Sequence, residues 1–140
     1  MNFNELDKNI TKNLKEIGIP FLRYSLAIVF IWFGILKPFG LSPAQLLVEN
    51  TVYWFDPSWF VPLLGWWEVL IGLCLLYKPL IRLGIGLLAL QMIGTFLPVF
   101  ILPGVVFGDS FYSLTLEGQY IVKNLVIIGA AMVIGSHVRD

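Results

Sequence analysis

The sequence predicts an all-α integral membrane protein, a four-helix bundle formed by one domain over residues 1–140. Three observations predict this class. Of the 140 residues, 58% are hydrophobic and 13% are charged, whereas soluble domains carry about 25% charged residues. A soluble chain of this length keeps too much of its surface wet to hide so many apolar side chains. Four apolar runs approach the roughly 20 residues that a membrane-spanning helix needs, and the basic residues are unevenly distributed between the loops.

The first expected element is an amphipathic helix over about residues 3–17. Its apolar side chains recur at spacings of three and four residues and form one stripe: Phe3, Leu6, Ile10, Leu14 and Ile17. The stripe predicts an interfacial helix on the cytoplasmic leaflet; a solvated helix without a special role remains the alternative. The charges before Pro20, and the lack of an apolar core there, argue against a signal peptide.

Four spans are expected after it, at about residues 20–37, 59–77, 80–102 and 118–135. Helices are favoured because lipid cannot satisfy free backbone polar groups, and the sequence lacks the alternating pattern of a membrane barrel. Between the first two spans, Ser42 suits a helix cap and Pro43 suits a first helical position. We therefore expect a short helix on the outer face.

The positive charges predict the orientation. The N-terminal segment, the loop between the second and third spans, and the C-terminal tail all contain Lys or Arg. The loops at 38–58 and 103–117 contain neither. Because Lys and Arg concentrate in cytoplasmic loops, both termini are predicted to face the cytoplasm. Arg23 and Arg82 are expected to anchor at lipid headgroups.

Glu68 is the single charge inside the second span. It follows the start of the span by about nine residues, or roughly 13 Å along a helix, which is near mid-membrane. An ionised carboxylate there costs several kcal/mol unless it is paired. Gly65 and Gly72 share its helical face, and small residues mark close helix packing. Glu68 is therefore predicted to point into the bundle.

Other polar side chains are expected to meet Glu68 in the outer half of the bundle. Lys37 ends the first span, Gln91 and Thr95 share a face of the third, and the fourth begins with two charged residues. The predicted ligand-binding residues are Lys37, Glu68, Gln91, Thr95, Glu117 and Lys123. Three interpretations stay open: a pocket for a small amphipathic ligand or a proton relay, a polar network that only holds the helices together, or snorkelling of Lys37 to the headgroups.

Several kinds of chemistry have no support in the sequence. The one cysteine, Cys74, can form no internal disulfide, and no Cys/His metal spacing exists. Phosphate loops, nucleophile triads and dinucleotide fingerprints do not occur. No metal, haem or nucleotide is therefore indicated, no catalytic residue is assigned, and nucleic-acid binding has no basis.

Three stretches together resemble a known family. They are "LRYSLAIVFIWFGILK", "LLGWWEVLIGLCLL" and "SLTLEGQYIVKNLVIIGAAMVIG". An Arg followed by Gly-x-x-Lys, a Glu before "LIGL", and a Thr-x-Glu-Gly…Lys opening of the last span are similar to the DoxX-like superfamily of small bacterial four-span membrane proteins. The similarity is closest to its YkgB branch, which includes a reactive-chlorine-resistance inner-membrane protein.

The resemblance implies a multi-pass protein of the bacterial inner membrane with a role in quinone-linked redox chemistry or oxidative stress. Superfamily members are named as subunits of thiosulfate–quinone oxidoreductase. The resemblance directs attention to five residues: Arg23, Lys37, Glu68, Glu117 and Lys123. It also implies a quinone-like ligand, and the electrons would be supplied by a membrane-protein partner. The loop at 38–58 is shorter than in YkgB-type relatives. The alternatives are a non-catalytic scaffold of a membrane complex and a small transporter or proton pathway, which would require homo-oligomers.

Overall fold

The computed structural model describes residues 1–139, and these are helical apart from their connections and one isolated bridge, Phe107 to Leu114. Its elements are α1 (Phe3–Leu36), α2 (Gln45–Thr51), α3 (Pro57–Leu76), a 3₁₀ turn η1 (Lys78–Leu80), α4 (Ile81–Ile101), α5 (Pro103–Val106), α6 (Leu116–Val122) and α7 (Asn124–Ser136). Four segments are long and apolar enough to cross a membrane: Phe3–Leu36, Pro57–Leu76, Lys78–Ile101 and Leu116–Ser136. The prediction of an all-α, multi-pass membrane protein is confirmed.

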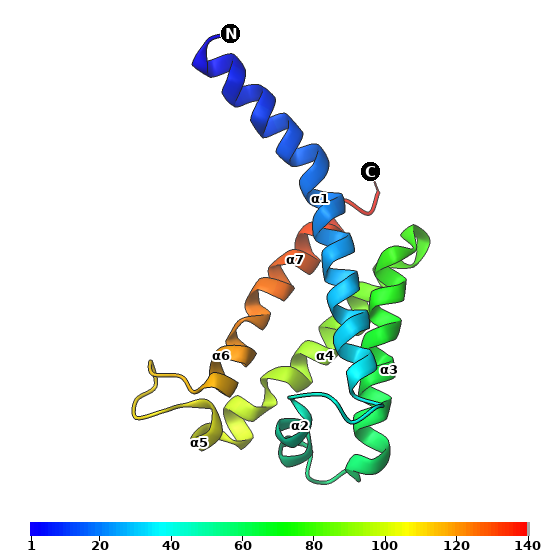
Figure 1. The fold of residues 1–140 in the computed structure, drawn as a ribbon, viewed down its shortest axis with the longest axis vertical. Coiled ribbons are helices and arrows are strands. Elements are labelled where there is room, and N and C mark those ends of the chain that lie inside the picture. Colours follow the sequence, from blue (N-terminus) through cyan, green and yellow to red (C-terminus); the bar gives the residue numbers. More distant parts are fainter. Residues whose placement is uncertain (140) are drawn as a thin grey trace.

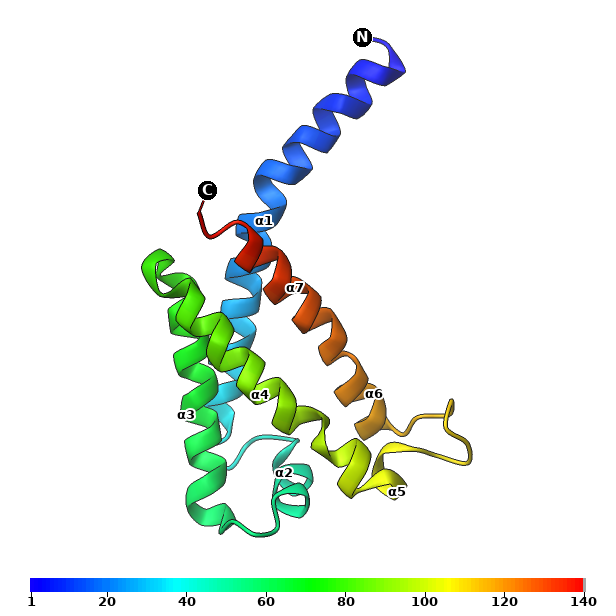
Figure 2. The ribbon, with the colours of Figure 1, turned by 180° about the vertical axis from the view of Figure 1, so that it is seen from behind.

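The four long segments run alternately up and down (Figures 1 and 2). α3 lies against α1, α4 returns beside α3, and α6 with α7 forms the last pass. Both termini lie at one end of the bundle, while α2 and α5 lie at the other. α6 and α7 lean away from α1 and α3 toward the α2–α5 end, so the helices diverge there. This divergence decides where the core and the cavity lie.

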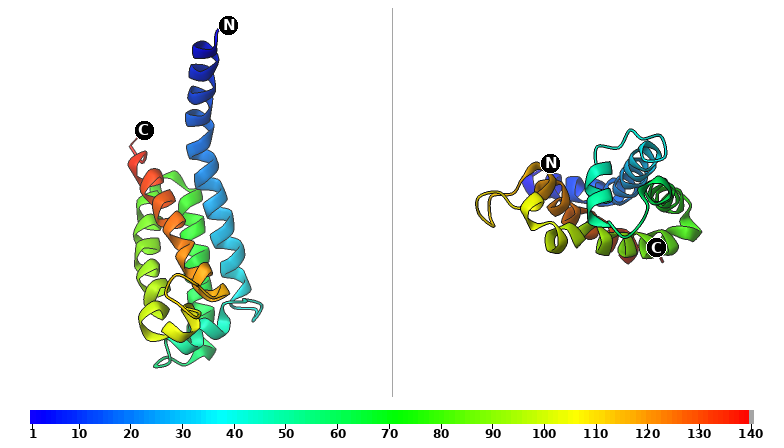
Figure 3. Two further views of the ribbon diagram at one scale, coloured as in Figure 1. Left: turned by 90° about the vertical axis from the view of Figure 1, so that its left-hand side faces the viewer. Right: turned by 90° about the horizontal axis from the view of Figure 1, so that it is seen from below.

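The N-terminal half of α1 differs from the prediction. The sequence favours a boundary between a helix at 3–17 and a span beginning near residue 20, but the structure has one helix with Pro20 inside it. Proline removes one backbone donor, and the carbonyl that it leaves free belongs to Glu16, which is exposed. The helix therefore continues, and its N-terminal half projects beyond the other helices (Figure 3).

Glycines bring α1 and α3 into close contact. A Cβ on Gly65 would lie 2.5 Å from the Gly34 carbonyl oxygen, and a Cβ on Gly34 would lie 2.6 Å from the Gly65 carbonyl oxygen. Gly72 approaches the Ala27 carbonyl in the same way, at 2.6 Å. Side chains at these positions would force the helices apart, so the glycines set the helix separation.

The apolar core lies where α1, α3, α4 and α7 converge, toward the end with the termini. Its buried members are Leu26, Ala27, Phe30, Ile71, Leu75, Ile81, Leu88, Met92, Ala130, Ala131 and Ile134. Many large apolar side chains on the outer faces are exposed instead, among them Trp32, Ile93 and Met132. Outward apolar surface of this extent suits contact with lipid rather than water.

Both ends of α3 are capped by side chains. Asp56 accepts the Ser58 backbone N–H at 2.9 Å, and this bond, with a further one from the Ser58 side chain, lowers the pKa of Asp56. At the other end, Arg23 donates from Nη1 to the carbonyls of Leu75 at 2.9 Å and Leu76 at 3.3 Å. A cation is favourable at a helix C-terminus. Arg23 therefore caps α3, a role that differs from the predicted headgroup anchor.

The connections at the α2–α5 end also differ in detail from the prediction. α2 begins at Gln45, after the expected Ser42–Pro43 start, while the Ser42 hydroxyl accepts the Ala44 N–H at 3.2 Å. Thr115 joins α5 to α6, because its hydroxyl donates to the Val106 carbonyl at 3.0 Å and accepts the Gly118 N–H at 3.0 Å. This contact fixes the start of the last pass.

Candidate functional site

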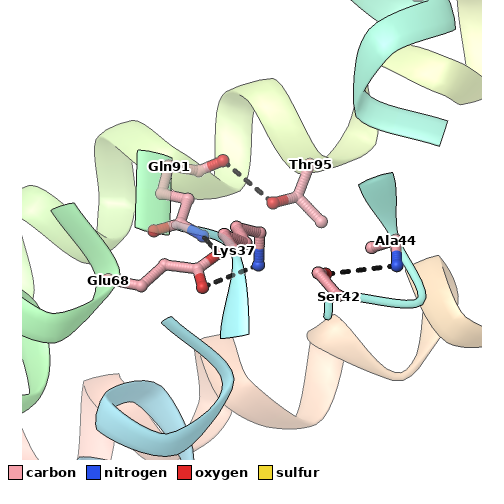
Figure 4. Close-up of polar contacts among 6 residues, drawn as sticks. All are labelled: Lys37, Ser42, Ala44, Glu68, Gln91 and Thr95. Carbon is pink, nitrogen blue, oxygen red and sulfur yellow. Dashed lines mark hydrogen bonds and ion pairs between the residues drawn. The ribbon is translucent and has the colours of Figure 1, made fainter. Parts of the chain in front are cut away.

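Three polar side chains from different helices meet inside the bundle (Figure 4). Lys37, the residue that ends α1, places its Nζ 2.8 Å from Oε2 of Glu68 on α3. Gln91 on α4 donates from Nε2 to Oε1 of the same carboxylate at 2.7 Å. Both oxygens of Glu68 are therefore bonded, and we call these three residues the polar cluster.

The polar cluster is buried. The side chains of Lys37 and Glu68 are only 7% and 9% exposed. Transfer of two charges out of water costs several kcal/mol for each ion, which their attraction and further hydrogen bonds must offset. The bond from Gln91 is such a contact. The prediction that Glu68 points into the bundle is confirmed. Lys37 pairs with Glu68 inside the bundle, so its ammonium does not reach out to the headgroups as the snorkelling interpretation would require.

The amide of Gln91 is only partly satisfied. Its Oε1 is buried and has no hydrogen-bond partner among the residues that the structure describes. Buried polar atoms are nearly always bonded, so an unmatched acceptor beside a charged pair is unusual. Thr95, one turn further along α4, donates its hydroxyl to the Gln91 backbone carbonyl at 3.0 Å. It shares the face of Gln91, as predicted, and this bond connects it to the backbone of the polar cluster.

A cavity of about 840 Å³ opens beside the polar cluster, where the helices diverge. Its wall is formed by α1, the 42–44 segment, α2, α3, α4 and the junction of α6 with α7. Most of the lining side chains are apolar, and they include Phe33, Leu64, Trp67 and Ile127. The Trp67 indole donates to the Leu87 carbonyl at 3.3 Å and so holds this wall between α3 and α4. The cavity is an apolar chamber with a polar cluster on one side.

Five of the six predicted site residues line this cavity: Lys37, Glu68, Gln91, Thr95 and Lys123. Lys123 is exposed and lies between α6 and α7. Glu117 is exposed in the first turn of α6 and is not part of the wall, so the structure does not bring it together with the other five. Lys123 lies six positions further along the chain, which is about 240° around a helix at 100° per residue. The carboxylate of Glu117 instead suits the positive end of α6.

Three polar residues that sequence reasoning missed also line the cavity: Ser42, Thr51 and Asn124. Asn124 donates its amide to the Tyr120 and Ile121 carbonyls, at 3.1 and 3.0 Å. Its position beside Lys123 inside an apolar span was a usable signal, since polar residues within spans are rare and often functional. Ser42 precedes α2 and Thr51 ends it, and no sequence signal marks either residue as part of a cavity wall.

Comparisons with protein-family models, with curated proteins and with solved structures find no match for this chain. The likeness to the DoxX-like superfamily therefore rests on the sequence motifs alone. In the part of the chain that the structure describes, no three His, Cys, Asp or Glu residues are grouped so that they could hold a metal ion.

Proposed function

We propose that this protein binds a small lipid-soluble molecule, quinone-like in character, in the cavity beside the polar cluster. One observation carries the proposal: a chamber of about 840 Å³ with mostly apolar walls has a few converging polar groups on one side. Pockets for small organic ligands typically measure about 300–1,000 Å³ and combine apolar walls with a few polar groups that orient the ligand.

The polar cluster offers donors to a ligand carbonyl. The ammonium of Lys37 carries three N–H groups and the amide of Gln91 carries two, and each residue uses one of them on Glu68. A quinone carbonyl beside them would accept a remaining donor, and Glu68 would exchange a proton with the bound molecule as its redox state changes. The resemblance to the DoxX-like superfamily supports this ligand and a role in oxidative stress.

In this proposal the protein is an accessory membrane subunit and not an enzyme on its own. The single cysteine provides no dithiol, so electrons would come from a membrane-protein partner. We place it in the bacterial inner membrane with both termini in the cytoplasm. The charge distribution supports this orientation. The connection between α3 and α4, where the sequence has Lys78 and Arg82, lies at the end with the termini (Figure 1). The segments 38–58 and 103–117, which lack Lys and Arg, connect the helices at the other end.

A second candidate function is a scaffold whose buried charges only hold the helices together. Two observations favour the scaffold: both carboxylate oxygens of Glu68 accept hydrogen bonds from other helices, and Gly34 lies very close to Gly65. Under this alternative the cavity contains only lipid acyl chains and has no preference for a polar headgroup.

A pair of glycine substitutions on α4 separates the two functions. A Cβ at Gly94 or at Gly86 would meet nothing within 4 Å, but only Gly94 lines the cavity. Gly94→Leu should fill the cavity, whereas Gly86→Leu should place the same side chain outside it. We expect decylubiquinone to raise the unfolding temperature of the wild type and of Gly86→Leu in lipid nanodiscs, because a ligand stabilises the state that binds it, and not that of Gly94→Leu.

Unfolding can be followed by the reaction of a thiol-specific dye with Cys74, which is the only cysteine and is 2% exposed. An equal temperature shift in all three proteins would place the quinone in bulk lipid. If none of the three proteins shows a shift although all are folded, the quinone-binding proposal is contradicted and the scaffold function is favoured.

A further inference from the structure

The charges in the cavity wall do not balance. Two lysines and one glutamate line it: Lys37, Lys123 and Glu68. Glu68 is committed to Lys37, with its two oxygens bonded to the Lys37 ammonium and the Gln91 amide. Lys123 is left as an uncompensated cation, so the wall carries one net positive charge.

No carboxylate of the described chain is placed to neutralise Lys123. The ion pairs among residues 1–139 are Lys12 with Glu16 and Lys37 with Glu68. Glu117 is exposed and is not part of the cavity wall, and Glu49, also outside the wall, accepts a bond from Gln45 on α2 at 3.0 Å. A lysine within a membrane-spanning segment is costly without a partner, so a partner from outside the chain is favoured.

We propose that the occupant of the cavity is an amphipathic anion, with a carboxylate or phosphate head at Lys123 and its apolar body against the wall near Phe33, Trp67 and Ile127. This rests on the proposed function and names the charge class of its ligand. A fatty acid or an acidic hydroxyquinone meets the requirement, and a neutral quinone leaves Lys123 unpaired. A charge-assisted hydrogen bond contributes about twice as much as a neutral one, so the ligand charge should dominate selectivity.

Two photoreactive probes of equal length test the charge class: a twelve-carbon fatty acid with a terminal diazirine and the corresponding alcohol. Each is crosslinked to the wild type, Lys123→Gln, Lys123→Arg and Gly94→Leu in phosphatidylcholine nanodiscs, and labelled peptides are quantified by mass spectrometry. Comparison of each variant with the wild type cancels differences in probe partitioning. Lys15→Gln, which removes an exposed lysine outside the cavity wall, is the matched control.

We expect Lys123→Gln to reduce labelling of the cavity by the acid about tenfold, as loss of a hydrogen bond to a charged group typically does, and to leave labelling by the alcohol unchanged. Lys123→Arg should restore labelling by the acid, Lys15→Gln should have no effect, and Gly94→Leu should block both probes. Equal labelling by acid and alcohol, unaffected by Lys123→Gln, would overturn the anion proposal while the cavity remained a binding site. Failure of both probes to label the cavity would overturn the proposed function itself.

The anion could be a free single-chain molecule or the headgroup of a bilayer lipid, and a second arm distinguishes these sources. Addition of phosphatidylglycerol to the nanodiscs should displace the acid probe if the lipid headgroup occupies Lys123. Labelling that persists in phosphatidylglycerol assigns the site to a free single-chain anion. Either result supports an anionic head at Lys123.

Discussion

Glu68→Leu should destabilise the protein by about 3–5 kcal/mol, because removal of one partner leaves the other charge buried and unpaired. Lys37 would then keep an ammonium in a site that is 7% exposed, and the Gln91 amide would lose its acceptor. The free energy of unfolding can be measured by titration of mixed micelles with dodecyl sulfate, with dye labelling of Cys74 as the readout.

The double variant Lys37→Met, Glu68→Leu is the control for this prediction. It removes both charges, and replacement of a whole buried pair by apolar side chains is often close to neutral. We expect it to recover most of the stability that either single variant loses. A coupling energy near zero in this double-mutant cycle would mean that the two side chains do not interact in the membrane.

The second large effect is expected at the contact between α1 and α3. A Cβ on Gly65 would lie 2.5 Å from the Gly34 carbonyl oxygen, 2.6 Å from Cδ of Pro38 and 2.7 Å from Cβ of Lys37. Gly65→Ala must therefore separate the helices and draw Lys37 away from Glu68. Overpacking of this kind costs about 1–3 kcal/mol, and the same dye assay measures it.

Gly86→Ala is the matched control for this contact, since a Cβ there meets nothing within 4 Å. Alanine is about 0.8–1.0 kcal/mol more favourable than glycine within a helix, so Gly86→Ala should be neutral or slightly stabilising. If Gly65→Ala proved as stable as Gly86→Ala, α1 and α3 would be further apart in the membrane than the structure places them.

Hydropathy located the spans well because length and apolarity are direct physical requirements for crossing lipid. The expected second span, 59–77, corresponds to Pro57–Leu76. The boundary near Pro20 was wrong because a proline signals a break locally, whereas an exposed helix segment tolerates one missing hydrogen bond. The positions of α1 residues 3–17 on the membrane surface and of α2 on the outer face stay predictions.

The site was partly predictable. The cost of burying a charge indicated that Glu68 needed a partner, and the glycines around it indicated which face pointed inward. The geometry then assigned Lys37 and Gln91 as its partners. The size and extent of the cavity could not be predicted, because they depend on how far α6 and α7 diverge from α1 and α3, and a single sequence does not specify this crossing geometry.

The central claim is that the cavity beside the polar cluster holds a small molecule, and native mass spectrometry of the protein released from nanodiscs tests it most directly. We predict an added mass of one small lipid-soluble molecule on the wild type and on Gly86→Leu, which disappears in Gly94→Leu while that variant stays folded. Identical spectra for all three proteins, with no added mass or with the same mass on each, would contradict the claim.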